Sequence, residues 1–168
     1  QRRHLQQLGV NALDAAEFGC GPGLRLEGID TGVCAMELRE PAHIVPTPAL
    51  PGPRLVAIDL RVRAPERVAA HWGQLLGLPL DRDSDGAPRL QAMPVHVRFV
   101  LARLGHASGV DALVLATDDA HRVARQAAAH GLASRQEDGQ FPALAVGGGK
   151  ARLLAHVPVQ LDGGSALQ

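Results

Sequence analysis

Strand alternation places six ionisable side chains on one face of a predicted β-sheet. In an extended strand, residues at every second position point to the same side of the sheet. Over residues 56–63 this separates the apolar side chains from Asp59 and Arg61, and over residues 95–102 it separates Phe99 from its polar neighbours. Together with a later strand, the predicted surface comprises Asp59, Arg61, His96, Arg98, Arg152 and His156.

Two kinds of chemistry fit these residue types. A guanidinium group binds a carboxylate or a phosphate through two parallel hydrogen bonds, so Arg61, Arg98 and Arg152 together would suit an anionic ligand. A histidine beside an aspartate can act as a general base. The same six residues also fit a solvated, charge-balanced sheet face or an interface between two sheet units. The sequence leaves these alternatives open.

The elements that would position this surface are repeated along the chain. Residues 57–78 align with residues 112–132 at an offset of 55 positions, and the triplet Arg-Val-Ala at 67–69 recurs at 122–124. Each copy predicts a strand, an amphipathic helix and a glycine that ends the helix. Three short strand-like segments follow each helix, separated by turn sequences such as Asp-Ser-Asp-Gly at 83–86. Each copy is therefore predicted to form a βαβββ unit.

Each predicted helix has its own sequence support. In the first, Pro65 suits the opening turn, because its missing N–H would have no partner within the helix. In the second, Thr117 or Asp118 is the predicted N-cap. The apolar stripes, at a spacing of 3.6 residues, are Val68, Trp72, Leu75 and Leu76 in the first helix and Ala120, Val123, Ala124, Ala127 and Ala128 in the second.

The first 40 residues are predicted to be an incomplete third copy. Residues 2–10 match the end of such a helix, and strand-like segments follow at 12–16, 24–28 and 33–38. By comparison with the two full copies, a leading strand and most of a helix are missing, which implies a four-module parent. The predicted organisation is an incomplete module at 1–40, a Pro-rich linker at 41–54, a two-module domain at 55–158 and a flexible tail at 159–168.

Paired βαβββ units resemble the vicinal oxygen chelate superfamily, which includes glyoxalase I, extradiol dioxygenases, methylmalonyl-CoA epimerase and bleomycin-resistance proteins. Residues 55–80, LVAIDLRVRAPERVAAHWGQLLGLPL, are similar to the opening strand and helix of that family, and residues 109–119, GVDALVLATDD, to the opening of a second module. The resemblance implies an α+β fold in which tandem βαβββ modules form a curved mixed sheet with helices on its convex face. It places the six polar side chains on the concave face and implies a homodimer.

The expected metal site of the family is mostly missing from the complete domain. Family enzymes usually bind a divalent metal through a His, Gln or Glu early in the first strand of a module and a Glu near the end of the last. The matching positions are Ala57 and Ala112 in the first strands, and Leu153 or Leu154 in the last. The resemblance therefore implies no metal cofactor in the complete domain. In the incomplete module, Glu37 of GVCAMELRE matches the ligand Glu, so a divalent metal is expected only there; the alternative is an exposed strand carboxylate.

Composition argues against several classes of partner. The 17 basic and 17 acidic residues cancel, so no basic surface for nucleic acid is predicted. No apolar run approaches the roughly 20 residues of a membrane span, and no signal-peptide segment is evident, so a cytoplasmic location is expected. The two cysteines, Cys20 and Cys34, are too few for a disulfide framework.

Three classes of function remain after this reading. The first is a glyoxalase-like protein that binds or transforms a small organic molecule, with an anion among the candidates and the usual metal site degenerate. The second is a metal-dependent lyase, isomerase or dioxygenase whose site lies in the incomplete N-terminal domain. The third is a non-catalytic module, similar to antibiotic-sequestering relatives or purely structural.

Overall fold

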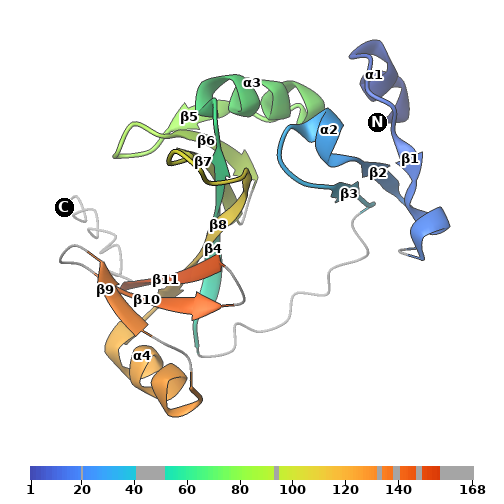
Figure 1. Cartoon of the computed structure of the whole chain (residues 1–168). Helices are drawn as coiled ribbons and strands as arrows, with labels where there is room; N and C mark the ends of the chain where they lie inside the picture. Colours follow the sequence, from blue (N-terminus) through green and yellow to red (C-terminus); the bar gives the residue numbers. More distant parts are fainter. Residues whose placement is uncertain are drawn as a thin grey trace, which may run out of the picture.

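Two βαβββ modules in tandem form an eight-stranded sheet, and the N-terminal residues, here called the N-terminal module, form a separate three-stranded sheet (Figure 1). The computed structural model describes residues 1–19, 21–40, 52–92, 95–131, 134–137, 141–146 and 149–155. The first complete module consists of β4 (Arg54–Val62), α3 (Pro65–Leu76), β5 (Leu80–Arg82), β6 (Pro88–Ala92) and β7 (Val95–Leu101). The second consists of β8 (Gly109–Thr117), α4 (Ala120–Ala129), β9 (Ser134–Glu137), β10 (Phe141–Val146) and β11 (Gly149–Ala155).

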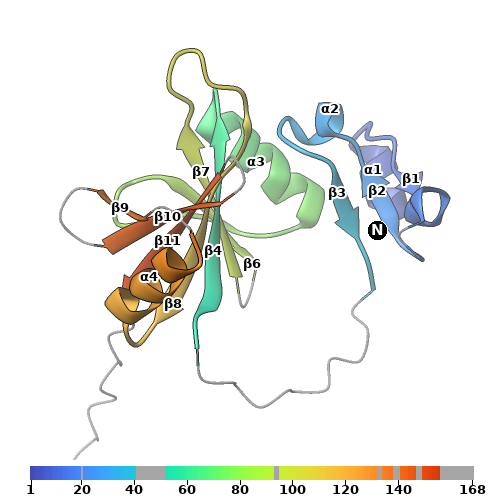
Figure 2. The same cartoon turned by 60° about the horizontal axis from the view of Figure 1, so that its bottom comes forward.

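The two modules share one strand arrangement, which confirms the predicted fold class. The sheet order is β5-β6-β7-β4-β8-β11-β10-β9, so β4 and β8 meet antiparallel in the centre. In each module the first strand lies parallel to the last, β4 beside β7 and β8 beside β11. The resulting sheet is twisted and curved, with α3 and α4 on its outer side (Figure 2). The 55-residue sequence repeat is thus a repeat of structure.

The core of the first complete module lies between α3 and one face of its strands. Leu60 and Val62 of β4 and Phe99 of β7 are buried against α3, as the alternation of apolar residues predicts. Trp72 of α3 meets Phe99 edge to face, with ring centroids 5.5 Å apart and an interplanar angle of 80°. Aromatic pairs prefer this geometry because the positive ring edge faces the negative ring face. The opposite face of β4 is left for polar side chains.

The ends of the two helices follow the predicted chemistry with one exception. Pro65 opens α3, and Gly77 closes it in the left-handed conformation at φ 66°. The predicted N-cap of α4, Thr117 or Asp118, is wrong. Asp119 is the N-cap, and its carboxylate accepts a hydrogen bond from the backbone N–H of Arg122 at 2.8 Å. Strand β8 continues through Thr117, so the helix begins later than the sequence pattern indicates.

The N-terminal module departs more from its sequence prediction. It consists of α1 (Arg2–Gln7), β1 (Leu13–Asp14), a 3₁₀ helix η1 (Ala15–Phe18), β2 (Leu24–Leu26), α2 (Gly28–Thr31) and β3 (Met36–Leu38). The predicted strand over 12–16 ends at Asp14, because the Asp14 carboxylate accepts a hydrogen bond from the N–H of Ala16 and starts a turn of 3₁₀ helix. The predicted strand over 33–38 is shortened to β3.

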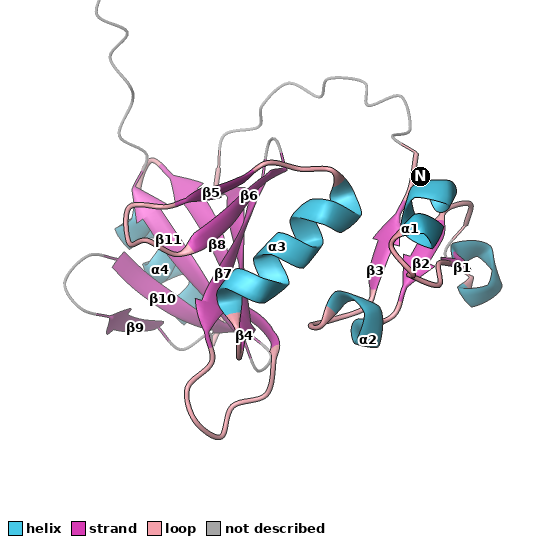
Figure 3. Ribbon diagram, turned by 90° about the horizontal axis from the view of Figure 1, so that it is seen from above, coloured by secondary structure: helices cyan, strands magenta, loops and turns pink. Residues whose placement is uncertain are grey.

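This N-terminal module packs against α3, as Figure 3 shows. A second core joins them, with Leu75 of α3 buried among Leu5, Val10 and Leu26. Four side chains then bond to backbone carbonyls across the interface. These are Trp72 to Thr31 (2.8 Å), His71 to Asp30 (2.6 Å), His4 to Gln74 (2.7 Å) and Gln1 to Leu75 (3.1 Å). α3 is therefore covered from two sides.

The predicted linker and tail fall mainly outside the described residues. Strand β4 begins at Arg54, one residue before the predicted domain start. Residues 41–51 and 156–168 are not described, so the predicted linker and flexible tail stay predictions. Among the described helices, none is long and apolar enough to cross a bilayer.

Candidate functional site

Strand pairing brings the predicted polar residues of the first complete module to one face of the sheet. β4 and β7 run parallel with Asp59 opposite Arg98 and Ala57 opposite His96. Directly paired residues of neighbouring strands share a face, and so do residues two positions apart on one strand. Asp59, Arg61, His96 and Arg98 therefore lie together, on the face that α3 does not cover.

The remaining two predicted residues come from the second complete module. Arg152 of β11 is paired with Val114 of β8, and Val114 is paired with Ala57. This register puts Arg152 in the same cross-strand row as Ala57, two strands away. His156 lies outside the described residues. The structure thus assigns five of the six positions to one surface by register.

Arg98 is the centre of a cluster of three carboxylates. Its Nε lies 2.7 Å from an oxygen of Asp83 and 3.7 Å from an oxygen of Asp59, and its Nη2 lies 3.7 Å from an oxygen of Asp85. Asp59 has no solvent exposure, whereas Asp85 is largely exposed. The Arg98 guanidinium therefore lies between the buried carboxylate of Asp59 on β4 and two carboxylates of the β5–β6 turn, those of Asp83 and Asp85.

The conformation of the β5–β6 turn is held by residues of its own sequence. One oxygen of Asp83 accepts hydrogen bonds from the N–H groups of Asp85 at 3.0 Å and Ala87 at 2.8 Å. Gly86 takes φ 80°, a conformation that other residues rarely adopt. The Asp-Ser-Asp-Gly sequence is a hairpin turn, as predicted. The sequence analysis did not predict that aspartates of this turn contact Arg98. The concentration of aspartates in the turn was the feature of the sequence that could have indicated it.

Arg61 is also engaged by a carboxylate. Its Nη1 lies 2.7 Å from an oxygen of Asp111, and its Nε donates to the carbonyl oxygen of Ala107 at 3.0 Å. A β-bulge causes this contact, because the β4–β8 register passes from Ala112 to Val110 and skips Asp111. Asp111 was not among the predicted site residues. A bulge cannot be read from alternation, so the sequence offered no signal for it.

These contacts change the expected chemistry of the surface. Sequence reasoning predicts arginines that are available to an anion, whereas Arg61 and Arg98 each contact aspartates. An incoming carboxylate or phosphate therefore meets arginines that are already partly neutralised by aspartates. His96 is placed beside Ala57 and Gln91 in the register rather than beside Asp59, and its Nδ1 is buried without a hydrogen-bond partner among the described atoms.

The structure places the predicted metal ligand Glu37 in an ion-pair network. Its carboxylate lies 2.7 Å from Nη2 of Arg39 and 3.5 Å from Nη1 of Arg25. Ala57 and Ala112 are buried in the β4 and β8 strands and offer no ligand atom. In the part of the chain that the structure describes, no group of three His, Cys, Asp or Glu side chains could hold a metal ion. The described residues therefore do not complete a metal centre around Glu37.

Two ionisable groups near these elements have shifted acidity. Hydrogen bonding from Arg89, with further bonds from the Arg82 N–H and Gln91, lowers the pKa of the Asp81 carboxyl below its ordinary value. Partial burial raises the pKa of the Cys34 thiol. Cys34 is a free cysteine whose thiol therefore stays protonated at neutral pH.

Comparisons with solved structures support the fold and reach no further. A hypothetical protein from Bacillus halodurans superposes with a TM-score of 0.51 at 11% identity, over 62% of this chain and 95% of that chain. A hypothetical protein from Staphylococcus aureus superposes with a TM-score of 0.51 at 8% identity, over 92% of this chain and 61% of that chain. At such identities the likeness shows a shared fold alone. No family model matches the sequence, and no curated protein matches it either.

Two enzymes are among the structures with lower similarity. Methylmalonyl-CoA epimerase from Mycobacterium tuberculosis has a TM-score of 0.46 at 12% identity, over 62% of this chain and 88% of that chain. 2,2',3-Trihydroxybiphenyl 1,2-dioxygenase from Sphingomonas wittichii has a TM-score of 0.49 at 18% identity, over 62% of this chain and 41% of that chain. Similarity at this level carries no argument about the chemistry of the present chain.

Proposed function

We propose that the chain is a glyoxalase-like protein of the vicinal oxygen chelate type that binds a small organic molecule on the concave face of its eight-stranded sheet. The observation that carries this proposal is the Asp59–Arg98 pair. Asp59 has no solvent exposure, and burying a charge costs free energy unless it is paired. Small-molecule sites hold a few convergent polar groups that fix the orientation of the ligand, and the face of β4 and β7 away from α3 carries such groups.

The ligand class follows from what already surrounds Arg98. Asp59 and Asp83 are buried or nearly so, but the side chain of Asp85 is 75% exposed and lies 3.7 Å from Nη2 of Arg98. Exposed ion pairs contribute little stabilising free energy, so of the three aspartates Asp85 is displaced from Arg98 at the smallest cost in free energy. A ligand carboxylate or phosphate would then take the Nη2 side of Arg98 in place of Asp85. The proposed ligand is therefore a small organic anion.

No metal enters this proposal, because Ala57 and Ala112 fill the positions where ligands would be needed. Glu37 stays a predicted ligand for a metal in the N-terminal module, where Arg25 and Arg39 now hold its carboxylate. A cytoplasmic location and a homodimer are likewise part of the proposal. Neither is needed for binding at Arg98.

Ligand binding is tested by titrating the full chain with small carboxylates, phosphate monoesters and neutral diols, using calorimetry after treatment with a chelator. Arg98→Gln is expected to weaken binding of the preferred anion by at least about tenfold, because a charge-assisted hydrogen bond is lost. Asp85→Asn is expected to tighten it roughly two- to fivefold, because a competing exposed carboxylate is removed.

Arg122→Gln is the control, since Arg122 is an exposed arginine of α4 that contacts a carboxylate of its own helix end, Asp119, at 3.9 Å. It should bind as the unchanged chain does. An unchanged affinity in Arg98→Gln would contradict the proposal. Metal bound in stoichiometric amount, measured by elemental analysis, together with binding that a chelator abolishes, would favour a metal-dependent site instead.

A further inference from the structure

The charges around Arg98 are not balanced. Asp83 and Asp85 of the β5–β6 turn already outnumber the single guanidinium, and Asp59 adds a carboxylate from β4. The other arginines of this region each contact a carboxylate of their own: Arg61 with Asp111 at 2.7 Å, Arg82 with Glu66 at 2.8 Å and Arg89 with Asp81 at 2.8 Å. The Arg98 cluster, defined as Asp59, Asp83, Asp85 and Arg98, thus holds more carboxylates than cations among the described residues.

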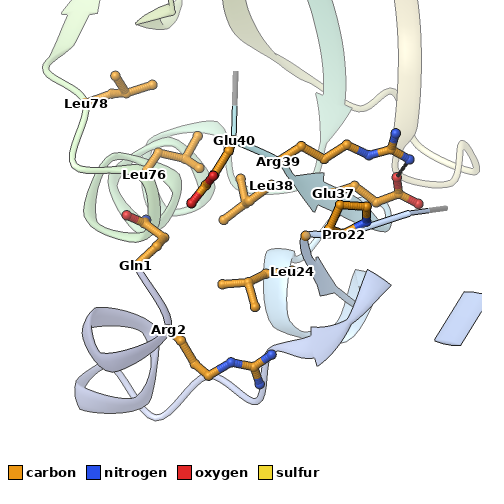
Figure 4. A pocket seen from close by; sticks show the side chains of 11 residues that line it. Gln1, Arg2, Pro22, Leu24, Glu37, Leu38, Arg39, Glu40, Leu76 and Leu78 are labelled. Atoms are coloured by element: carbon orange, nitrogen blue, oxygen red, sulfur yellow. Dashed lines mark hydrogen bonds and ion pairs between the residues drawn. The ribbon is translucent and has the colours of Figure 1, made fainter. Parts of the chain in front are cut away.

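A groove over the N-terminal sheet shows the opposite state. It has a volume of about 920 Å³ and is lined by the start of α1, by β2 and β3 and by the end of α3 (Figure 4). Its charged side chains are two of each sign, Arg2, Glu37, Arg39 and Glu40. Glu37 contacts Arg39 at 2.7 Å. The charges that line this groove cancel, whereas the excess at the Arg98 cluster favours one sign of charge in a ligand.

The excess negative charge lies on the solvent side of the Arg98 cluster. The Asp59 side chain has no solvent exposure and that of Asp83 is 9% exposed, whereas that of Asp85 is 75% exposed. One oxygen of Asp83 contacts Arg98, and the other accepts from the N–H groups of Asp85 and Ala87. Asp85 is therefore the carboxylate that a positive group from solvent reaches with the least desolvation.

A plain anion at Arg98 would make the imbalance larger. The ligand anion proposed above takes the Nη2 side of Arg98, which now lies 3.7 Å from an oxygen of Asp85. Asp85 then loses its contact with the guanidinium and lies beside a second negative group, and like charges at this range repel. A cationic nitrogen on the ligand, a few bonds from its anionic oxygens, would replace the guanidinium as the partner of Asp85.

A second observation points to a polar ligand on the same face. His96 lies two residues before Arg98 on β7, so the two side chains share a face of the sheet. The Nδ1 atom of His96 is buried and has no hydrogen-bond partner among the described atoms. A buried polar atom without a partner costs free energy, and a polar group of a bound ligand would remove that cost.

We propose that the ligand of this site carries both an anionic group, which binds Arg98, and a cationic nitrogen a few bonds away, which binds Asp85. Amino acids and aminoalkyl phosphates belong to this class. The inference rests on the function proposed above and narrows its ligand class. The N–H groups of the cationic nitrogen donate charge-assisted hydrogen bonds to the Asp85 carboxylate, so both exposed partners of the present ion pair receive a new partner from one ligand.

The test compares two pairs of ligands that differ by one amino group, β-alanine with propionate and 2-aminoethyl phosphate with ethyl phosphate. Their affinities for the full chain are measured by calorimetry at neutral pH and constant ionic strength. In each pair we expect the amino-bearing member to bind about three- to fivefold more tightly, which is the size of one exposed ion pair. Arg98→Gln should weaken binding of both members, because both use the guanidinium.

Asp85→Asn removes the proposed partner of the nitrogen and keeps the size of the side chain. The plain anion should bind more tightly to this variant, as expected above, whereas the preference for the amino-bearing member should fall to about one. Asp118→Asn is the matched control, because Asp118 is an exposed carboxylate that follows β8 and does not belong to the Arg98 cluster. This control should keep the preference of the unchanged chain.

The outcomes separate this inference from the proposed function. Equal affinities within both ligand pairs would overturn the inference and leave the anion site in place. A preference that persists in Asp85→Asn would overturn the assignment of the nitrogen to Asp85. Absence of binding by all four ligands would overturn the inference, and unchanged affinities in Arg98→Gln would overturn the proposed function with it.

Discussion

The helices α3 and α4 occupy equivalent places in two copies of one repeat, yet they are buried to very different extents. In α3 the residues Val68, Ala69, Trp72 and Leu75 are buried, whereas in α4 only Ala120 is. The repeat offset pairs Trp72 with Ala127. The largest aromatic side chain of the chain thus stands where the second copy has a small one.

The difference arises from what covers each helix. α3 packs on the large sheet through Trp72 and Phe99, and on the N-terminal module through Leu75. The indole N–H of Trp72 also donates to the carbonyl oxygen of Thr31 at 2.8 Å. α4 packs on its own strands through a small cluster around Ala120. A repeated sequence therefore specifies the same local fold, while the neighbouring elements determine how much free energy each copy contributes.

The largest effect is expected from Trp72→Ala, which makes α3 resemble α4 at this position. It removes the Phe99 contact and the bond to Thr31 and leaves a cavity, so the free energy of unfolding should fall by about 3–5 kcal/mol. Urea denaturation followed by circular dichroism measures the loss. The control Val123→Ala in α4 should cost about 1 kcal/mol, because fewer buried methyl groups are removed. Equal losses in the two helices would contradict the comparison.

A smaller effect is expected from a buried hydroxyl at the same interface. The Thr31 hydroxyl donates to the carbonyl oxygen of Cys34 at 2.6 Å and accepts from the N–H of Cys34 at 3.2 Å. Thr31→Val keeps the shape but leaves these backbone groups without that partner, at a cost of about 1–3 kcal/mol. Hydrogen exchange should speed up in the N-terminal module and stay unchanged in α4.

Thr117 provides the matched control for this substitution. It is also buried, but its hydroxyl accepts only one described bond, from the N–H of Asp119 at 3.4 Å. Thr117→Val should therefore destabilise the protein less than Thr31→Val does. A larger loss from Thr117→Val would show that α4 depends on its entry turn more than the packing indicates.

The smallest effect is expected from a substitution at an ion pair between β5 and β6, in the module that contains α3. The Arg89 guanidinium, 2.8 Å from Asp81, is the first cause of the lowered pKa of that carboxyl. A carboxyl whose pKa is lower in the folded state stabilises the fold above its unfolded pKa of about 3.9, and this contribution is lost as the pH falls through the folded value. Arg89→Gln should raise the Asp81 pKa toward its ordinary value, as measured by carbon NMR titration. Arg82→Gln, which keeps the backbone N–H bond to Asp81, should leave it nearly unchanged.

Sequence reasoning succeeds where the controlling interactions are local. The alternation of β4 and β7 correctly assigns Asp59 and Arg98 to one face, because side-chain direction in a strand has a period of two. The stripe Val68, Trp72, Leu75 is buried as predicted, for the equivalent reason in a helix. Local chemistry also explains one miss, since the Asp14 side chain ends β1 early by capping η1.

The partners of the arginines in the candidate site could not be predicted from strand alternation. Asp83 reaches Arg98 because the β5–β6 turn folds over the sheet, and Asp111 reaches Arg61 because a bulge shifts the β4–β8 register. Both contacts join residues that are distant in sequence, and a single shift in register changes which side chains meet. An arginine that the pattern makes available to a ligand is thereby already engaged by an aspartate.

The sequence by itself predicted the repeated βαβββ units, the buried stripe of the first helix and the shared face of Asp59, Arg61, His96 and Arg98. These follow from periodicities of the backbone that hold within each element. Only the tertiary structure decided that the N-terminal module covers α3, that three aspartates surround Arg98 and that Asp111 contacts Arg61. Those features depend on which elements meet in space, and the free energy of such long-range contacts has no periodic signature along the chain.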